Sequence, residues 1–161
     1  VSFANTVVVL TSNLGSECFQ SGSAGIGFGR RDQPGQVRDR VLEAARAALV
    51  PELWGRLDER LVFEPLSRDH VRRIAELQLE ESSEALFAER SISLEWSDQV
   101  LELLLDRGGY SPDTGARGMR QAIQRFVEAP LSDAILAGRL NDGDVASLDV
   151  TAESIAVSRS G

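Results

Sequence analysis

The stretch Gly109-Tyr110-Ser111-Pro112-Asp113-Thr114-Gly115-Ala116-Arg117, with the apolar pattern that follows it, decides how this chain is expected to fold. After Arg117, apolar residues recur at spacings of three and four, which predicts one long helix with a buried face. The residues of that face are Met119, Ala122, Ile123, Phe126, Val127, Leu131, Ala134 and Ile135. We expect Pro130 to kink or divide this helix and Gly138 to end it.

Arg117 and Arg120 fall in the predicted first turn of this helix. The positive end of the helix dipole lies there, so an acidic side chain would normally be favoured. One interpretation is that the guanidinium groups bind an anion such as phosphate, together with the free amides of the helix start. The other is a surface arginine paired with Asp113 or Glu128.

The residues around this stretch predict a small helical domain with a short sheet. Pro65 should end the preceding element, and Ser67 is suited to cap a new helix. The expected elements are, in chain order, a helix from Ser67 to about Arg90, a half-buried strand over 91–96, a helix capped by Ser97 that runs through Leu105 to a stop at 108–109, and a terminal strand pair over 145–150 and 155–157.

Residues 6–10 are apolar on both faces, the pattern of a central parallel strand, and such a strand requires neighbouring strands. Because the chain starts at Val1 with this run, we expect it to be an excised piece of a longer protein, with the neighbours in sequence outside it. Asn13 follows the run, where open α/β sheets bind ligands. It is a candidate to orient a water or a phosphate oxygen, or else it caps the next segment.

Residues 21–35 are rich in glycine and serine, which predicts a surface loop. This loop contains Ile26, Gly27 and Phe28, and two large apolar side chains in a polar loop suggest a docking peptide. The alternative is that Phe28 folds back onto its own domain.

The pattern then predicts a helix over 36–50, a short helix over 52–54 that Gly55 ends, and a short buried strand over 61–63. Arg56 is therefore expected on an exposed corner. An arginine placed there can stabilise charge on a phosphoryl group held by a neighbouring molecule. The alternative is an ion pair within the chain with Asp58 or Glu59.

The composition of the chain excludes several function classes. The 161 residues carry a net charge of -8, and all 17 basic residues are arginine. A basic surface for nucleic acid or an anionic membrane is therefore not expected, and no helix carries the basic face of a helix-turn-helix DNA binder. A phosphate-binding P-loop would need a lysine, and the chain has none, so we expect no P-loop in it. With a single cysteine and a single histidine we expect neither a disulfide nor a metal site, and with no leader or spanning segment we expect a cytoplasmic protein.

Three separated segments, in this order, resemble the Clp class of AAA+ protein-unfolding ATPases, and the resemblance covers almost the whole chain. Residues 5–15 resemble the sensor-1 strand, residues 51–59 with 62–63 and 65–66 resemble the arginine-finger segment, and residues 109–117 with 120–124 resemble the sensor-2 segment. The chain departs from the family pattern at Trp54-Gly55, where Leu or Ile followed by Asn is usual, and at Gly118-Met119, where Pro-Leu is usual.

The resemblance implies an α+β fold from the C-terminal part of the second ATPase module. Residues 1–65 would be the remnant of the large α/β subdomain, and residues 66–161 the small C-terminal subdomain of three to four helices with a short sheet. Asn13 would sense the γ-phosphate of ATP, held with Mg, and position water. Arg56 would reach the nucleotide of the adjacent subunit, and Arg117 would contact nucleotide in its own subunit. The Walker A and Walker B segments would lie upstream, so this chain alone is not expected to hydrolyse ATP.

The resemblance also implies partners. The parent would be a homo-hexameric ring that unfolds proteins, including tagged substrates, with no nucleic-acid or membrane partner. Ile26-Gly27-Phe28 resembles the tripeptide with which protease-associated members dock on the peptidase ClpP. A stand-alone disaggregase without a peptidase is one alternative, and a non-enzymatic module that mediates oligomer assembly is another.

Overall fold

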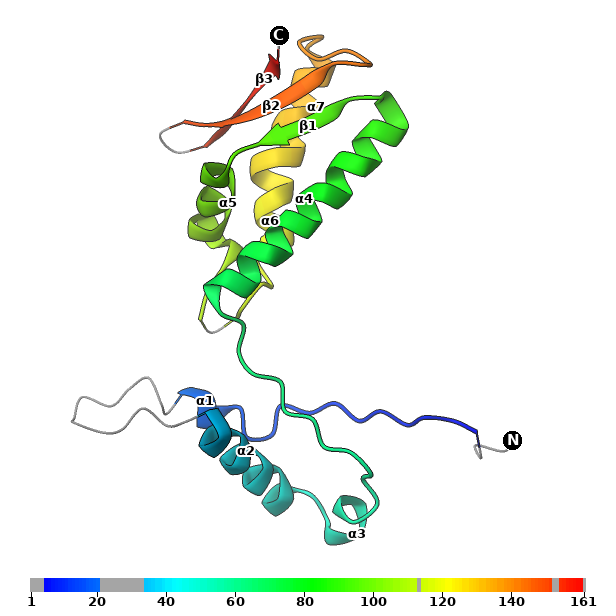
Figure 1. The fold of residues 1–161 in the computed structure, drawn as a ribbon, viewed down its shortest axis with the longest axis vertical. Coiled ribbons are helices and arrows are strands. Elements are labelled where there is room, and N and C mark those ends of the chain that lie inside the picture. Colours follow the sequence, from blue (N-terminus) through cyan, green and yellow to red (C-terminus); the bar gives the residue numbers. More distant parts are fainter. Residues whose placement is uncertain (1–4, 21–33, 113, 152–153, 161) are drawn as a thin grey trace, which may run out of the picture. The chain divides into compact units, whose positions relative to one another are not determined.

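The computed structural model describes residues 5–20, 34–112, 114–151 and 154–160. The chain divides into two compact units, Val1–Glu64 and Pro65–Gly161 (Figure 1). The division falls next to the predicted domain boundary. That the first unit is a remnant of a larger subdomain stays a prediction.

The second unit has the predicted α+β architecture, a layer of helices against one face of a small sheet (Figure 1). Its elements are α4 (Arg68–Arg90), β1 (Ser93–Trp96), α5 (Asp98–Leu104), the π-helical turn η1 (Leu105–Gly109), α6 (Met119–Ile123), the π-helical turn η2 (Gln124–Glu128), α7 (Ala129–Leu136), β2 (Val145–Val150) and β3 (Ile155–Ser160).

The sheet has three strands in the order β1-β2-β3. Strand β1 pairs with β2 in parallel, with Leu94 opposite Ala146, and β2 pairs with β3 in antiparallel fashion, with Val150 opposite Ile155. A parallel pair requires a crossover connection. The helices from α5 to α7 form that crossover, which brings β2 beside β1 although about fifty residues separate them.

The buried side chains of the second unit form one hydrophobic core, to which both helices and strands contribute. The predicted alternation of residues 91–96 is confirmed, because Ile92 and Leu94 are buried while Glu95 is exposed. The largest side chains that are almost fully buried are Leu79, Ile92, Leu104, Leu105, Met119, Ile123 and Leu148. The apolar face predicted after Arg117 is thus the side that packs into the core.

Local hydrogen bonds fix the ends of α4. The Ser67 hydroxyl accepts a hydrogen bond from the His70 N–H at 3.2 Å, and His70 Nδ1 accepts one from the Ser67 N–H at 3.5 Å. The predicted cap is therefore confirmed, with His70 completing a reciprocal capping box. Ser97 also precedes its predicted helix, α5, but its side chain forms no capping hydrogen bond.

The predicted long helix is divided by the wide turn η2, which directly precedes α7 and its Pro130. Proline has no N–H to donate to the carbonyl four residues earlier, and the π turn accommodates that missing bond. Gly138 ends α7 with φ +68°. The Gly138 N–H donates to the Ile135 carbonyl and the Arg139 N–H to the Ala134 carbonyl, the pattern of a Schellman C-cap.

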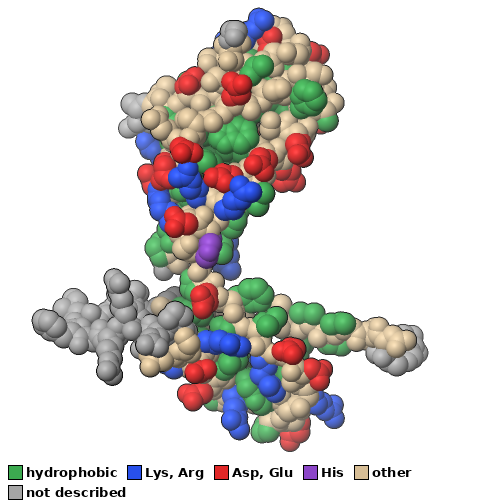
Figure 2. Space-filling view, viewed as in Figure 1, with side chains coloured by type: hydrophobic (Ala, Val, Ile, Leu, Met, Phe, Trp, Pro, Cys, Tyr) green, Lys and Arg blue, Asp and Glu red, His purple; other side chains and the backbone are tan. Residues whose placement is uncertain are grey.

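The first unit contains α1 (Glu17–Gln20), α2 (Pro34–Ala48) and α3 (Pro51–Trp54). The strands predicted over 6–10 and 61–63 are not formed, because neither segment pairs with another strand within the described residues. Val7 is 92% exposed and Phe63 is 86% exposed. A strand needs a neighbour to satisfy its backbone donors and acceptors, and the described residues supply none to these segments. Figure 2 shows hydrophobic side chains exposed along the N-terminal segment.

Candidate functional site

Arg117 lies just before α6, at the end of a closed loop. The Ser111 N–H donates to the Gly115 carbonyl at 3.2 Å, and the Gly115 N–H donates back to the Ser111 carbonyl at 2.7 Å. Helix α6 begins at Met119, so Arg117 precedes the first turn in which it was predicted. Its side chain is exposed and forms no ion pair within the described residues, from which Asp113 is absent.

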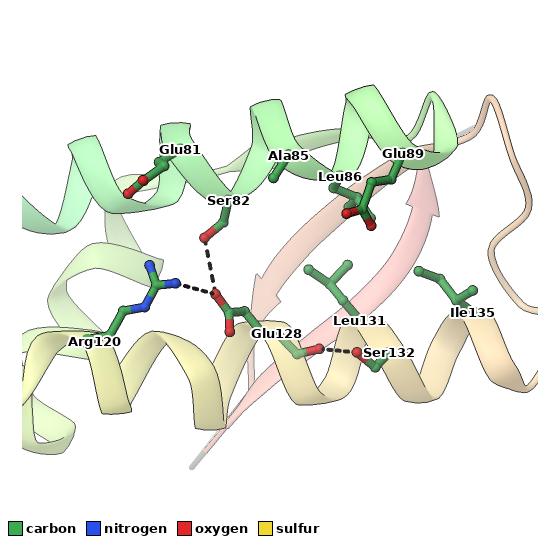
Figure 3. Close-up of a pocket in the computed structure, with 10 residues that line it drawn as sticks. All are labelled: Glu81, Ser82, Ala85, Leu86, Glu89, Arg120, Glu128, Leu131, Ser132 and Ile135. Atoms are coloured by element: carbon green, nitrogen blue, oxygen red, sulfur yellow. Dashed lines mark hydrogen bonds and ion pairs between the residues drawn. The ribbon is translucent and has the colours of Figure 1, made fainter.

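Arg120 has a different environment from Arg117. Its Nη2 lies 4.0 Å from Glu128 Oε1, and the same carboxylate oxygen accepts a hydrogen bond from the Ser82 hydroxyl at 3.3 Å. Figure 3 shows Arg120 directed toward Glu128 in a groove between α4 and the α6–α7 helices. Glu128 is therefore engaged by Arg120 and not by Arg117, which removes one of the two ion pairs considered for Arg117.

Two glycines fix the chain that carries Arg117. A Cβ atom added to Gly118 would overlap the carbonyl oxygen of Gly108, and one added to Gly109 would lie 2.5 Å from both the Leu104 carbonyl oxygen and Met119 Cε. The start of α6 thus packs backbone against backbone on the end of η1. Nothing in the local sequence pattern predicts a packing role for Gly109 or Gly118. The Gly-Gly pair at 108–109 is visible in the sequence. Its packing role becomes clear only in the fold, where the Gly118 backbone lies against it.

Arg56 follows α3 on the exposed corner that the sequence predicts. Its N–H donates to the Leu53 carbonyl at 3.1 Å, which fixes the backbone of the corner. The side chain is exposed, and the ion pair considered with Asp58 or Glu59 does not occur in the described residues. The guanidinium group is therefore available to another molecule.

Asn13 is exposed and follows the extended segment 6–10. Its backbone carbonyl accepts a hydrogen bond from the Ser16 N–H at 3.1 Å, in the turn before α1. Its side-chain amide forms no hydrogen bond within the described residues. The turn is therefore built without this amide, which leaves it available to a ligand.

Arg60 is a further residue of this region, and the sequence pattern did not predict its contact with Trp54. Arg60 places its guanidinium carbon 4.5 Å from the centroid of the Trp54 ring, and its Nη2 donates to the Trp54 carbonyl at 2.7 Å. An arginine six positions after a tryptophan is visible in the sequence, but that spacing alone does not indicate a contact.

The predicted site residues are divided between the two units. Asn13 and Arg56 belong to the first unit and Arg117 to the second. Their meeting around one nucleotide therefore stays a prediction. Ile26, Gly27 and Phe28 lie outside the described residues.

The other arginine cluster has a structural role. Arg68 and Arg72 of α4 pair with the α5 carboxylates Asp98 and Glu102, and Arg68 also pairs with Asp106 of η1. Hydrogen bonds to these carboxylates, first of all Arg68 to Glu102 and Arg72 to Asp98, raise the pKa of both arginines above its ordinary value. Figure 2 shows acidic and basic side chains gathered together on the second unit. These pairs join α4 to α5 and η1, and neither Arg68 nor Arg72 is left free to bind a ligand.

The described part of the chain holds no group of acidic, cysteine and histidine side chains suited to a metal ion. Among the described helices, none has the length and apolar character needed to cross a bilayer.

Comparison with known proteins places the chain in a family. Residues 66–148 match the family model described as the C-terminal, D2-small domain, of ClpB protein. The chaperone protein ClpB of Meiothermus ruber is 43% identical over 147 residues, which cover 89% of this chain and 16% of that protein. The ATP-dependent Clp protease ATP-binding subunit ClpA homolog of Pyropia yezoensis is 37% identical over 158 residues, covering 95% of this chain and 19% of that protein.

A solved structure agrees with these relatives. A closed-state cryo-electron microscopy reconstruction of Hsp104 with ATPγS and FITC casein superposes with a TM-score of 0.69 and 25% identity, covering 91% of this chain and 25% of that chain. The chain thus spans between 16% and 19% of the length of the curated relatives named here. The sequences of relatives named ClpB and of relatives named ClpA homolog both match it.

Proposed function

The chain belongs to the family of the C-terminal, D2-small domain of ClpB protein, and from that premise we propose that it is the nucleotide-responsive end of an ATP-dependent, Clp-type protein unfoldase. One observation carries the proposal. Arg56 and Arg117 lie in the segments that resemble the arginine-finger and sensor-2 segments, and both are exposed guanidinium groups without ion pairs in the described residues. An unpaired guanidinium group, which is always charged and can donate two parallel hydrogen bonds, is suited to bind a phosphate.

The proposed roles follow from this chemistry. Arg117 would contact the phosphates of ATP bound in its own subunit, at the start of a helix fixed by the Gly108–Gly118 contact. Arg56 would reach the nucleotide of the adjacent subunit, and Asn13 would hold a water beside the γ-phosphate. Bound Mg–ATP supplies the phosphoryl group and the free energy of its hydrolysis. The P-loop that holds it would lie elsewhere in the parent protein, since this chain contains no lysine.

A role for Arg56 in trans requires an oligomer, and we propose a homo-hexameric ring in the cytoplasm. Its substrates would be unfolded or tagged proteins. The exposed apolar segment at residues 7–10 supports placement in a larger subdomain, because a run with exposures from 60% to 92% is suited to burial between further strands.

The decisive experiment replaces Arg56 in the full-length parent. Arg56→Ala should lower ATP turnover by about a thousandfold or more while ATP binding is retained. The reason is that an arginine in this role stabilises the negative charge on the phosphoryl group in the transition state, not the bound ATP. The matched control is Arg38→Ala, an exposed arginine of α2, which should leave turnover unchanged. Unchanged turnover in Arg56→Ala would refute the proposed role.

A second experiment separates a peptidase-associated unfoldase from a stand-alone disaggregase, since relatives named chaperone protein ClpB and relatives named Clp protease ATP-binding subunit both match the chain. In the first case Phe28→Ala should slow degradation by added ClpP and leave unfolding of the same substrate unaffected. Equal loss of both activities, or no stimulation of ClpP by the unsubstituted protein, would contradict docking through this loop.

A further inference from the structure

Trp54 and Arg60 form a cation–π contact in the first unit. The Arg60 guanidinium lies over the indole ring, 4.5 Å from its centroid, and Nη2 donates to the Trp54 carbonyl at 2.7 Å. Arg60 Nε is buried and has no hydrogen-bond partner among the described residues. Trp54 also borders a hollow lined by residues of α2, namely Asp39, Leu42, Glu43 and Arg46.

This contact closes the loop that carries Arg56. The Trp54 carbonyl accepts the Arg60 guanidinium and also the Leu57 N–H at 3.4 Å, while the Arg56 N–H donates to the Leu53 carbonyl. Residues 54–60 therefore form a short loop with its two ends tied together. Arg56 is the exposed arginine inside the loop, and Arg60 is the half-buried one at its base.

We propose that Arg60, held on Trp54, is a positioning residue for Arg56. The inference rests on the proposed role of Arg56 in trans. A long side chain can act on a neighbouring subunit only if its backbone is fixed, since a displacement of about 1 Å can cost roughly a hundredfold in rate. The Trp54–Arg60 pair supplies this restraint, because a guanidinium can stack on the ring and donate to the carbonyl at once.

The test uses the full-length parent and compares Arg60→Ala with Arg60→Lys. Arg60→Ala should lower kcat about tenfold with less than about a twofold change in the ATP KM, because binding is retained while geometry in the transition state is lost. Lysine keeps a cation over the ring but loses the forked donor, so Arg60→Lys should recover part of the rate. Trp54→Phe should likewise retain more activity than Trp54→Ala. Arg38→Ala is the control.

A double-mutant cycle distinguishes positioning from a merely structural role. When Arg56 is already alanine, adding Arg60→Ala should not lower the residual turnover further, because no finger remains to be positioned. A readout independent of activity is amide hydrogen exchange. The amides of Gly55, Arg56 and Leu57, which donate to backbone carbonyls, should exchange about fivefold faster in Arg60→Ala, and those of α4 should not change.

The outcomes separate this inference from the proposed function. If Arg56→Ala lowers turnover about a thousandfold and both Arg60 variants retain the full rate, the positioning role is overturned and the function stands. If Arg60→Ala lowers the residual turnover of Arg56→Ala as much as that of the unsubstituted protein, Arg60 is only structural and the inference is again overturned. If Arg56→Ala itself has no effect on turnover, the proposed function fails, and the positioning role fails with it.

Discussion

Gly118→Ala would place one methyl group where the backbone of another segment already lies. The added Cβ would overlap the Gly108 carbonyl oxygen and lie 3.1 Å from the Gly108 carbonyl carbon and 3.9 Å from the Gly109 Cα. All of these are backbone atoms, so no side-chain rotation can relieve the overlap. Either α6 or η1 must move, and both contribute buried residues to the core.

The expected loss of stability can be bounded. Forcing an extra carbon into a packed interior costs about 1 to 3 kcal/mol, and contact with backbone places Gly118→Ala near the upper end. Alanine recovers up to about 1 kcal/mol, because it restricts the unfolded chain more than glycine does. The net destabilisation of the second unit is then about 2 kcal/mol, which lowers the urea midpoint by roughly 1 to 2 M.

The assay is urea unfolding of the 161-residue chain, followed by tryptophan fluorescence. Trp54→Phe in the background leaves Trp96, which packs against the core of the second unit, as the only reporter. Gly35→Ala in the first unit is the control, since its added Cβ meets no atom within 4 Å and the Trp96 midpoint should not change. An unchanged midpoint in Gly118→Ala would refute the claim that this glycine is required by contact.

Three further outcomes are expected with the same assay. Leu79→Ala should cost about 2 to 5 kcal/mol because Leu79 is fully buried, whereas Leu77→Ala, on the same helix but 50% exposed, should cost far less; equal costs would contradict the assigned core. Ser67→Ala should cost about 1 kcal/mol through the lost cap of α4, and no change would show that the capping box is not formed in solution. The raised pKa values of Arg68 and Arg72 mean that their contribution is complete at lower pH and is lost only as pH rises through the folded-state values, far above neutrality. The difference in midpoint between the unsubstituted chain and Arg68→Met should therefore stay constant from about pH 6 to pH 9, and a difference that shrinks across this range would contradict the assignment.

Local sequence signals gave the elements of the second unit correctly because their causes are local. The start of α4 depends on Ser67 and a partner three residues away, and its end lies where the periodic pattern stops. The end of α7 depends on a glycine that adopts a positive φ, a conformation that costs other residues more. The alternation of residues 91–96 reflects a strand with one buried face.

Residues 6–10 and 61–63 were also predicted as strands, the first with its neighbouring strands in sequence outside the chain, and neither is paired within the described residues. Both segments have the composition of buried strands, and both are exposed in the first unit, with Leu61 at 76%. The pattern of a strand reports a tendency to pair, whereas the pairing itself needs another strand. Sequence therefore identified the surface that requires a partner without showing that the partner is present.

By itself, the sequence determined the helices and strands of the second unit and which arginines were candidates for a phosphate. Only the tertiary structure decided that Glu128 engages Arg120 and leaves Arg117 exposed, that Gly118 meets Gly108, and that Arg60 lies on Trp54. The physical reason is that periodicity and caps act within one helical turn or strand. The charge state of a guanidinium is fixed in advance, but whether it is free depends on which carboxylate or ring the folded chain brings within a few ångströms.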